Sequence, residues 1–133
     1  MPALRRALAL SAIAVNTLAA VATSHLMLSH SSGDPSGYVL WALAPSVAML
    51  LISVAASLRL MDAAAALVGS LAVSGFGAYL IYDALCIHPD PQSGLVAIVL
   101  PAVQLWGAGL TVAVILALRF GQWLLWPEPP NNA

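Results

Sequence analysis

Apolar residues fill four long stretches of this chain, and polar residues gather in the short segments between them. Each stretch has roughly the 20 residues that a helix needs to cross the core of a bilayer. Only a helix satisfies its own backbone hydrogen bonds without water, so each stretch is predicted to be α-helical, and no segment has a strand pattern. We therefore predict an all-α, polytopic membrane protein, a compact bundle of four transmembrane helices in a single domain of residues 1–133. The predicted spans are residues 7–28, 38–58, 63–82 and 95–118.

The segments between the spans are short and rich in turn-forming residues. They cover residues 29–37, 59–62 and 83–94. The first and third contain Asp-Pro followed closely by Ser-Gly, which favours a sharp break after a helix.

The arginines indicate how the spans are oriented. Arg5 and Arg6 precede the first span, Arg59 lies between the second and third, and Arg119 follows the fourth, so all lie on one side. The positive-inside rule then places both termini, including the tail of residues 119–133, in the cytoplasm.

Composition agrees with a membrane location. Hydrophobic residues make up 62% of the chain and charged residues 7%, whereas soluble domains are about half apolar and about a quarter charged. These values, with one Cys and four basic residues, exclude a soluble domain, a disordered chain, a disulfide scaffold and a nucleic-acid binder. Trp123 and Trp126 suit an interfacial aromatic belt. We expect a bacterial inner-membrane protein, and the absence of Lys and the heavy use of Ala and Leu suggest a GC-rich genome.

The first span has a second interpretation. Arg5-Arg6, the apolar run and Ala20-Val21-Ala22 also match a cleavable signal peptide, and cleavage would leave three spans. The apolar run continues past this point to Leu28, which favours a retained first span.

The second and fourth spans resemble each other. In each, an Asp-Pro…Ser-Gly segment precedes an apolar run with a proline, Pro45 or Pro101, eight or seven residues after the glycine. Either the chain contains two parallel two-helix repeats, or two membrane helices look alike by chance. Each proline is expected to kink its helix, because it frees the carbonyl of Trp41 or Ala97. Two kinks at equal depth are expected either to open a cavity that faces outward or to serve only the packing of the helices.

Small residues recur at helical spacing in every span, a pattern that allows helices to approach closely within the bundle or between copies. These stripes are Ala12, Asn16, Ala20 and Ser24; Ser46, Ser53 and Ser57; Ser70, Ser74 and Ala78; and Gly109, Ala113 and Ala117.

Two amide side chains are predicted near the middle of the membrane. Asn16 and Gln104 each lie nine residues into their spans, hence about 14 Å deep in a core about 30 Å thick. They are expected either to clasp the helices by hydrogen bonds, including one to each other, or to form the polar waist of a conduction path.

Polar and ionisable residues are concentrated on the outer side. Tyr79 and Asp83 share a helix face, so the phenol is expected beside a carboxylate that handles a proton or cation. Metal binding is a further interpretation, although the ligand spacing matches no known site. These residues also fit solvated loops and interfacial anchors. Besides Tyr79 and Asp83, the group comprises Asp34, Tyr82, Cys86 and the candidate metal ligands His25, His30, His88 and Asp90.

No catalytic triad, phosphate-binding loop or dinucleotide-binding motif is present in the sequence, and no cofactor is expected. The leading hypothesis is a non-enzymatic accessory, assembly or protective component that binds a membrane-protein partner, or a copy of itself, within the bilayer. The alternative is a small oligomeric transporter or channel with an outer vestibule around Asp83. A membrane enzyme or metal or redox protein that uses the outer His and Asp residues is the third hypothesis.

Overall fold

The computed structural model describes residues 1–30, 36–89 and 93–125, and all of its regular elements in these ranges are helical. This confirms the predicted all-helical class. In chain order the elements are α1 (Pro2–His30), α2 (Ser36–Ala56), α3 (Leu60–Ser70), the π-helical η1 (Leu71–Gly75), α4 (Phe76–Tyr82), the π-helical η2 (Asp83–Ile87) and α5 (Ser93–Leu125).

The segments α3, η1, α4 and η2 form one composite helix, Leu60–Ile87, which we call the third helix. With it, four helices are long and apolar enough to cross a membrane. Three predicted spans lie inside the observed helices, and the second runs two residues past the end of α2. The other three helices of this length and hydropathy are Pro2–His30, Ser36–Ala56 and Gly94–Leu125.

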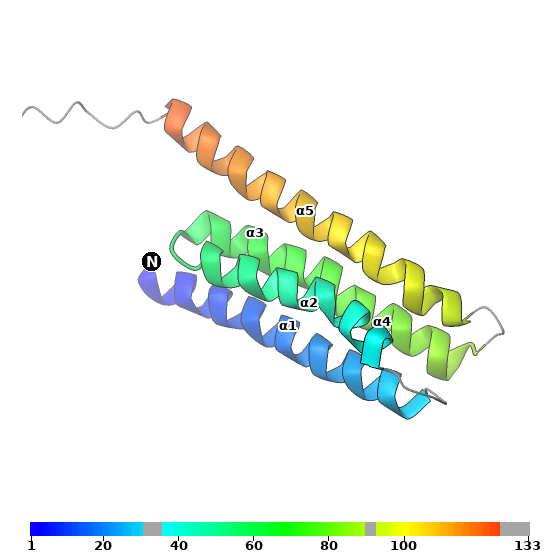
Figure 1. Ribbon diagram of the computed structural model, residues 1–133. Helices are drawn as coiled ribbons and strands as arrows, with labels where there is room; N and C mark the ends of the chain where they lie inside the picture. Colours follow the sequence, from blue (N-terminus) through cyan, green and yellow to red (C-terminus); the bar gives the residue numbers. More distant parts are fainter. Residues whose placement is uncertain (31–35, 90–92, 126–133) are drawn as a thin grey trace, which may run out of the picture.

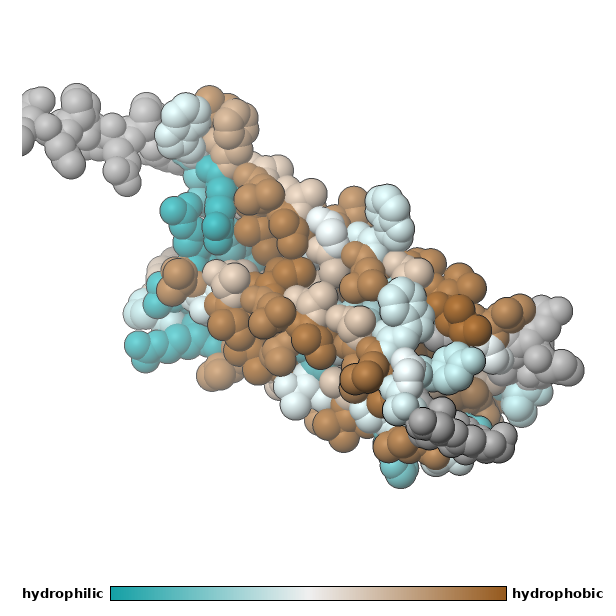
Figure 2. Space-filling view, in the orientation of Figure 1, coloured by the Kyte–Doolittle hydropathy of each residue, from teal (hydrophilic) through white to brown (hydrophobic). Residues whose placement is uncertain are grey.

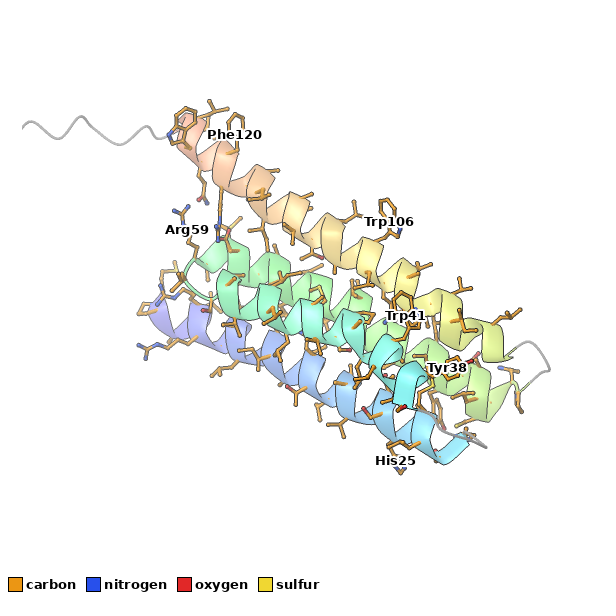
Figure 3. All side chains as sticks on the ribbon, viewed as in Figure 1. His25, Tyr38, Trp41, Arg59, Trp106 and Phe120 are labelled. Carbon is orange, nitrogen blue, oxygen red and sulfur yellow. The ribbon has the colours of Figure 1, made fainter. Side chains whose placement is uncertain are left out.

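The helices run side by side along their lengths (Figure 1). Helix α1 packs against α2 and the third helix, and α5 packs against the same two elements. Hydrophobic side chains cover most of the face in Figure 2, and hydrophilic ones gather toward the end that holds Arg59 (Figure 3).

Three apolar clusters lie in sequence along the interior. The buried side chains of each cluster come from three different helices, and the first cluster also includes the partly buried Leu100 of α5, so it joins all four spans. Their buried members are Met27, Ala42 and Ile81; Met49, Val73 and Ala108; and Ala56, Ala66 and Ile115.

The buried stripe of α1 differs slightly from the predicted one. Ala12 and Asn16 are buried as expected, but Ala20 and Ser24 are only half-buried. A constant step of four residues drifts around a helix of 3.6 residues per turn, whereas alternating steps of three and four stay on one face. The buried residues follow alternating steps as far as Thr23 and then one further step of four: Ala9, Ala12, Asn16, Ala19, Thr23 and Met27.

Of the two alternatives for the small-residue stripes, the α5 stripe does not follow packing within the chain. Gly109, Ala113 and Ala117 are exposed, because α5 turns its other side inward. The inward side carries Pro101, Gln104, Ala108, Thr111 and Ile115.

The two proline-containing helices are joined near their prolines. Pro45 and Pro101 are both buried inside continuous helices. The Trp41 indole nitrogen of α2 donates a hydrogen bond of 2.9 Å to the carbonyl of Ile98 in α5. Since Ile98 lies three residues before Pro101, this bond crosses between the helices close to the predicted kink of α5.

Candidate functional site

Asn16 joins three helices through its amide nitrogen. Nδ2 donates to the hydroxyl oxygens of Ser53 at 3.1 Å and Ser70 at 3.0 Å. The two serines donate in turn to the carbonyls of Met49 and Ala66, each at 2.7 Å. Asn16, Ser53 and Ser70 are fully buried. Every donor in this network is therefore used, and α1, α2 and the third helix are held together at this depth.

Gln104 joins α5 to the third helix in a different way. Its Nε2 donates a hydrogen bond of 2.6 Å to the carbonyl of Val73, which lies in the π-helical segment η1. Gly77 makes room for this contact, because a Cβ there would come within 2.5 Å of the Gln104 Cδ.

The expected hydrogen bond between Asn16 and Gln104 is therefore not formed. Each amide instead donates a hydrogen bond to the third helix, Asn16 to the Ser70 hydroxyl and Gln104 to the Val73 carbonyl. Three atoms of this region are buried without a hydrogen-bond partner among the described residues: Asn16 Oδ1, Gln104 Oε1 and Ser74 Oγ. These oxygens are the groups that a buried water or a cation would contact.

An ion pair between a buried carboxylate and a partly exposed arginine lies near the start of the third helix. Arg119 Nε donates to Asp62 Oδ2 at 2.8 Å, and the Asp62 side chain is 1% exposed while that of Arg119 is 41% exposed. Asp62 lies in the first turn of α3, where the helix dipole also favours a negative charge. Sequence reasoning assigned Asp62 to a connecting segment and missed this role. The sequence feature that could have indicated this ion pair is an acid next to the start of one span and an arginine directly after the end of another.

The arginines gather at one end of the molecule. The Arg5 Nη1 donates to the Leu58 carbonyl at 2.9 Å, next to Arg59 in the α2–α3 connection, and Arg119 contacts Asp62 just beyond it. We call this the arginine end, defined by Arg5, Arg6, Arg59 and Arg119.

At the opposite end, the candidate ligands form two separate pairs. His88 Nδ1 lies 3.2 Å from Asp83 Oδ1, and His30 Nε2 lies 3.9 Å from Cys86 Sγ. His25 is exposed (Figure 3). Within residues 1–30, 36–89 and 93–125, no three His, Cys, Asp or Glu side chains come together in a group that could hold a metal. Asp34 and Asp90 lie outside the described residues, as does Trp126.

The expected contact between Tyr79 and Asp83 is replaced by another. Tyr79 stacks on Phe76 with ring centroids 6.1 Å apart. Asp83 begins the π-helical segment η2, in which the His88 backbone nitrogen bonds to the Asp83 carbonyl at 2.8 Å. Because a π-helical turn brings residues five apart together, His88 rather than Tyr79 lies beside the carboxylate.

The outward side of α5 has an unusual composition for a surface at this depth. Trp106 is 78% exposed, and it lies eleven residues after Leu95 and twelve before Leu118, at the centre of the predicted span. A Cβ at Gly109 would meet nothing within 4 Å. We call this surface, formed by Trp106, Gly109, Ala113 and Ala117, the Trp106 face.

Four long apolar helices are the defining feature of a multi-pass, α-helical membrane protein. Comparison with protein families, with characterised proteins and with solved structures gives no match for this chain.

Proposed function

We propose that this protein is a non-enzymatic component of a bacterial inner membrane that binds a transmembrane helix of another membrane protein through the Trp106 face. The observation that carries this proposal is the position of Trp106, largely exposed at the centre of α5.

A tryptophan at this depth is costly when it faces lipid. The indole N–H has no hydrogen-bond acceptor among the described residues, and hydrocarbon offers none. Tryptophan side chains in membrane proteins are enriched instead at the interfaces, where their polar atom meets water or headgroups. A neighbouring helix removes this cost by covering the ring and providing an acceptor.

The rest of the Trp106 face suits helix–helix contact. Gly109, Ala113 and Ala117 are spaced four apart and exposed, so they form a stripe without large side chains on the same side of α5 as Trp106. Small residues at this spacing let two helices approach closely enough for van der Waals contact along their backbones.

The proposal includes a compact four-helix arrangement with the arginine end in the cytoplasm. The three apolar clusters and the two amide contacts support the arrangement. The positive-inside rule supports the orientation. Two parallel repeats are supported by the burial of Pro45 and Pro101 at equivalent places in their helices.

The test is to produce the tagged full-length chain in bacteria, to solubilise the membranes mildly, and to capture the proteins bound to the chain. Trp106→Leu removes the indole N–H, and Gly109→Leu places a large side chain in the stripe of small residues. Trp123→Leu is the matched control, since Trp123 is an exposed tryptophan of the same helix outside the Trp106 face. A membrane protein that is captured by the wild type and the control but lost with both face variants supports the proposal.

Two results contradict it. Capture that the face variants leave unchanged would show that the Trp106 face is not the contact surface. Recovery of the chain alone, with crosslinks between two copies at position 109, would show that the face joins copies of this protein.

A second candidate function is a small oligomeric transporter or channel. The three unpartnered buried oxygens of Asn16, Ser74 and Gln104 favour it, because they provide acceptors for a solute in the interior. Its test is flux in liposomes, with Gln104→Leu at the waist and Asp83→Asn at the outer vestibule. Flux that both variants alter supports transport, and absence of flux over a broad panel of ions and solutes contradicts it.

A further inference from the structure

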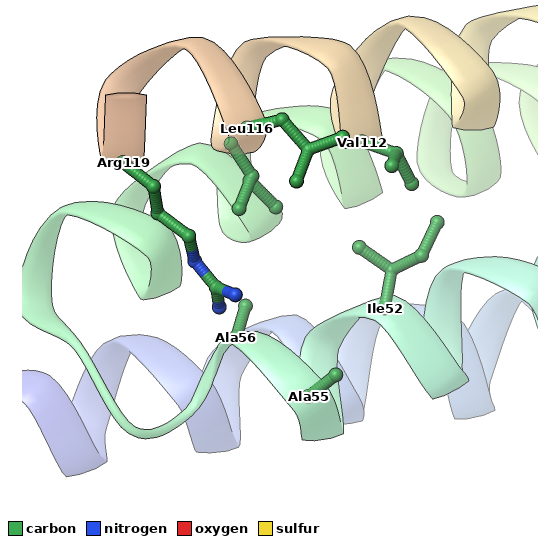
Figure 4. Close-up of a pocket in the computed structure, with 7 residues that line it drawn as sticks. Ile52, Ala55, Ala56, Val112, Leu116 and Arg119 are labelled. Atoms are coloured by element: carbon green, nitrogen blue, oxygen red, sulfur yellow. The ribbon is translucent and has the colours of Figure 1, made fainter. Parts of the chain in front are cut away.

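A groove lies between α2 and α5 close to the arginine end (Figure 4). It has a volume of about 150 Å³. Its walls are apolar except at one end, where the Arg119 guanidinium points toward Ala56 (Figure 4). We call this the Arg119 groove, lined by Ile52, Ala55 and Ala56 of α2 and by Val112, Leu116 and Arg119 of α5.

The guanidinium is held in place by only one of its donor groups. Nε is bonded to the buried carboxylate of Asp62 at 2.8 Å. The two terminal nitrogens, Nη1 and Nη2, have no acceptor among the described residues. Since a guanidinium presents five N–H donors in a fixed planar fork, the free edge is preset to bind a planar or tetrahedral anion.

The surroundings favour an anion further. The arginine end has four arginines and one acid, Asp62, among the described residues, so its side chains carry a formal charge of +3. Asp62 is fully buried and already paired, so the surface of this end is positive. Basic pockets between transmembrane helices on the cytoplasmic side are the surroundings that anionic lipid headgroups prefer.

We propose that the Arg119 groove binds one anionic phospholipid. Its phosphate accepts hydrogen bonds from Nη1 and Nη2 of Arg119. The first part of one acyl chain lies along the apolar walls between Ile52 and Leu116. Asp62 is a positioning residue, because it holds the guanidinium at the end of the groove without touching the lipid.

The groove and the Trp106 face adjoin on α5 but are formed by different residues. Val112 and Leu116 line the groove, whereas Trp106, Gly109 and Ala113 do not. Separate variants test the two proposals, Asp62→Asn with Arg119→Gln for the lipid and Trp106→Leu for the partner, so the failure of one is distinguishable from the failure of the other.

The experiment measures lipid binding to the purified full-length chain by native mass spectrometry. The probes are phosphatidylglycerol and phosphatidylcholine with identical acyl chains, and glycerol phosphate serves as a probe without chains. One phosphatidylglycerol per chain is expected, held about tenfold or more tightly than phosphatidylcholine. Both lipids carry the phosphate, but the choline cation of phosphatidylcholine cancels its charge and is repelled by the positive arginine end. Equal retention of the two lipids, or full competition by glycerol phosphate, would overturn the proposal.

Variants locate the binding. Arg119→Gln alone leaves a buried carboxylate unpaired, so the double change Asp62→Asn with Arg119→Gln is used, which keeps a neutral pair. It is expected to abolish the preference for phosphatidylglycerol. Arg59→Gln is the matched control, because it removes an exposed positive charge at the same end outside the groove. An equal loss from the control would mean that surface charge alone attracts the lipid.

A second variant tests the chain-binding part without touching the ion pair. Ala55 is an exposed wall residue, so Ala55→Leu fills the groove from its open side. It is expected to weaken phosphatidylglycerol retention several-fold. Unchanged retention in Ala55→Leu would contradict a lipid in this groove.

Discussion

The contact between Gly77 and Gln104 gives a sharp test of how α5 is fixed to the third helix. An added Cβ at Gly77 would lie 2.5 Å from Gln104 Cδ and closer still to Nε2. Gly77→Ala therefore forces the Gln104 side chain away and breaks its hydrogen bond to the Val73 carbonyl. Gly75→Ala is the matched control two residues away, since its Cβ would meet only ordinary contacts at 3.8 and 3.9 Å.

The two substitutions are expected to change the free energy of unfolding in opposite directions. At Gly77 the crowding costs about 1–3 kcal/mol, and the lost interhelical hydrogen bond costs about 1 kcal/mol more. Replacing a helical glycine by alanine returns about 1 kcal/mol at either position. Gly77→Ala should therefore destabilise the protein by about 1–3 kcal/mol, whereas Gly75→Ala should stabilise it by up to about 1 kcal/mol.

The measurement is reversible unfolding in detergent micelles, followed by circular dichroism and tryptophan fluorescence. The Gln104→Ala background provides the decisive comparison. With the long side chain removed, Gly77→Ala no longer causes a collision, so its destabilisation should largely disappear. If Gly77→Ala costs as much in this background as in the wild type, or costs nothing in either, the assigned contact is wrong.

Three further predictions use the same unfolding measurement. Asn16→Leu, which keeps the volume but removes both donors to Ser53 and Ser70, should cost about 1–2 kcal/mol, whereas Thr17→Val, an exposed change one residue away, should cost less. Arg119→Gln should destabilise more than Asp62→Asn, because only the former leaves a fully buried carboxylate without its partner, and a double-mutant cycle giving no coupling would contradict the pair. Trp41→Phe should cost about 1 kcal/mol by removing the indole donor to Ile98, and an equal cost in Trp123→Phe would assign the loss to tryptophan in general.

The four spans were predictable because span length and hydropathy are local properties of the sequence. A run of apolar residues long enough to cross the bilayer must be helical whatever it packs against. The composite third helix shows the limit of this reasoning. Its two π-helical segments change which side chains meet, and they bring His88 to Asp83 and the Val73 carbonyl to Gln104.

The partners of the polar residues were harder to predict, because they lie far apart in the sequence. Asp62 and Arg119 are separated by 57 positions, and Asn16 and Ser70 by 54. The sequence pattern also left open which face of α5 points inward. Small residues at helical spacing mark a close approach, but they do not say whether the neighbour is a helix of the same chain or of another.

Two polar contacts explain why α5 turns the side that it does. Lipid is as apolar as leucine, so hydrophobicity alone does not choose which apolar face of a membrane helix points inward. Gln104 and Arg119 are fifteen residues apart, about four turns, and therefore lie near the same side of the helix. One donates to Val73 and the other to Asp62, so α5 is held to the third helix at two depths. Trp106 lies on the same side of α5 as Gly109 and Ala113, opposite the side that carries Gln104 and Arg119. Because the two contacts hold the Gln104 side against the third helix, the side with Trp106 faces outward.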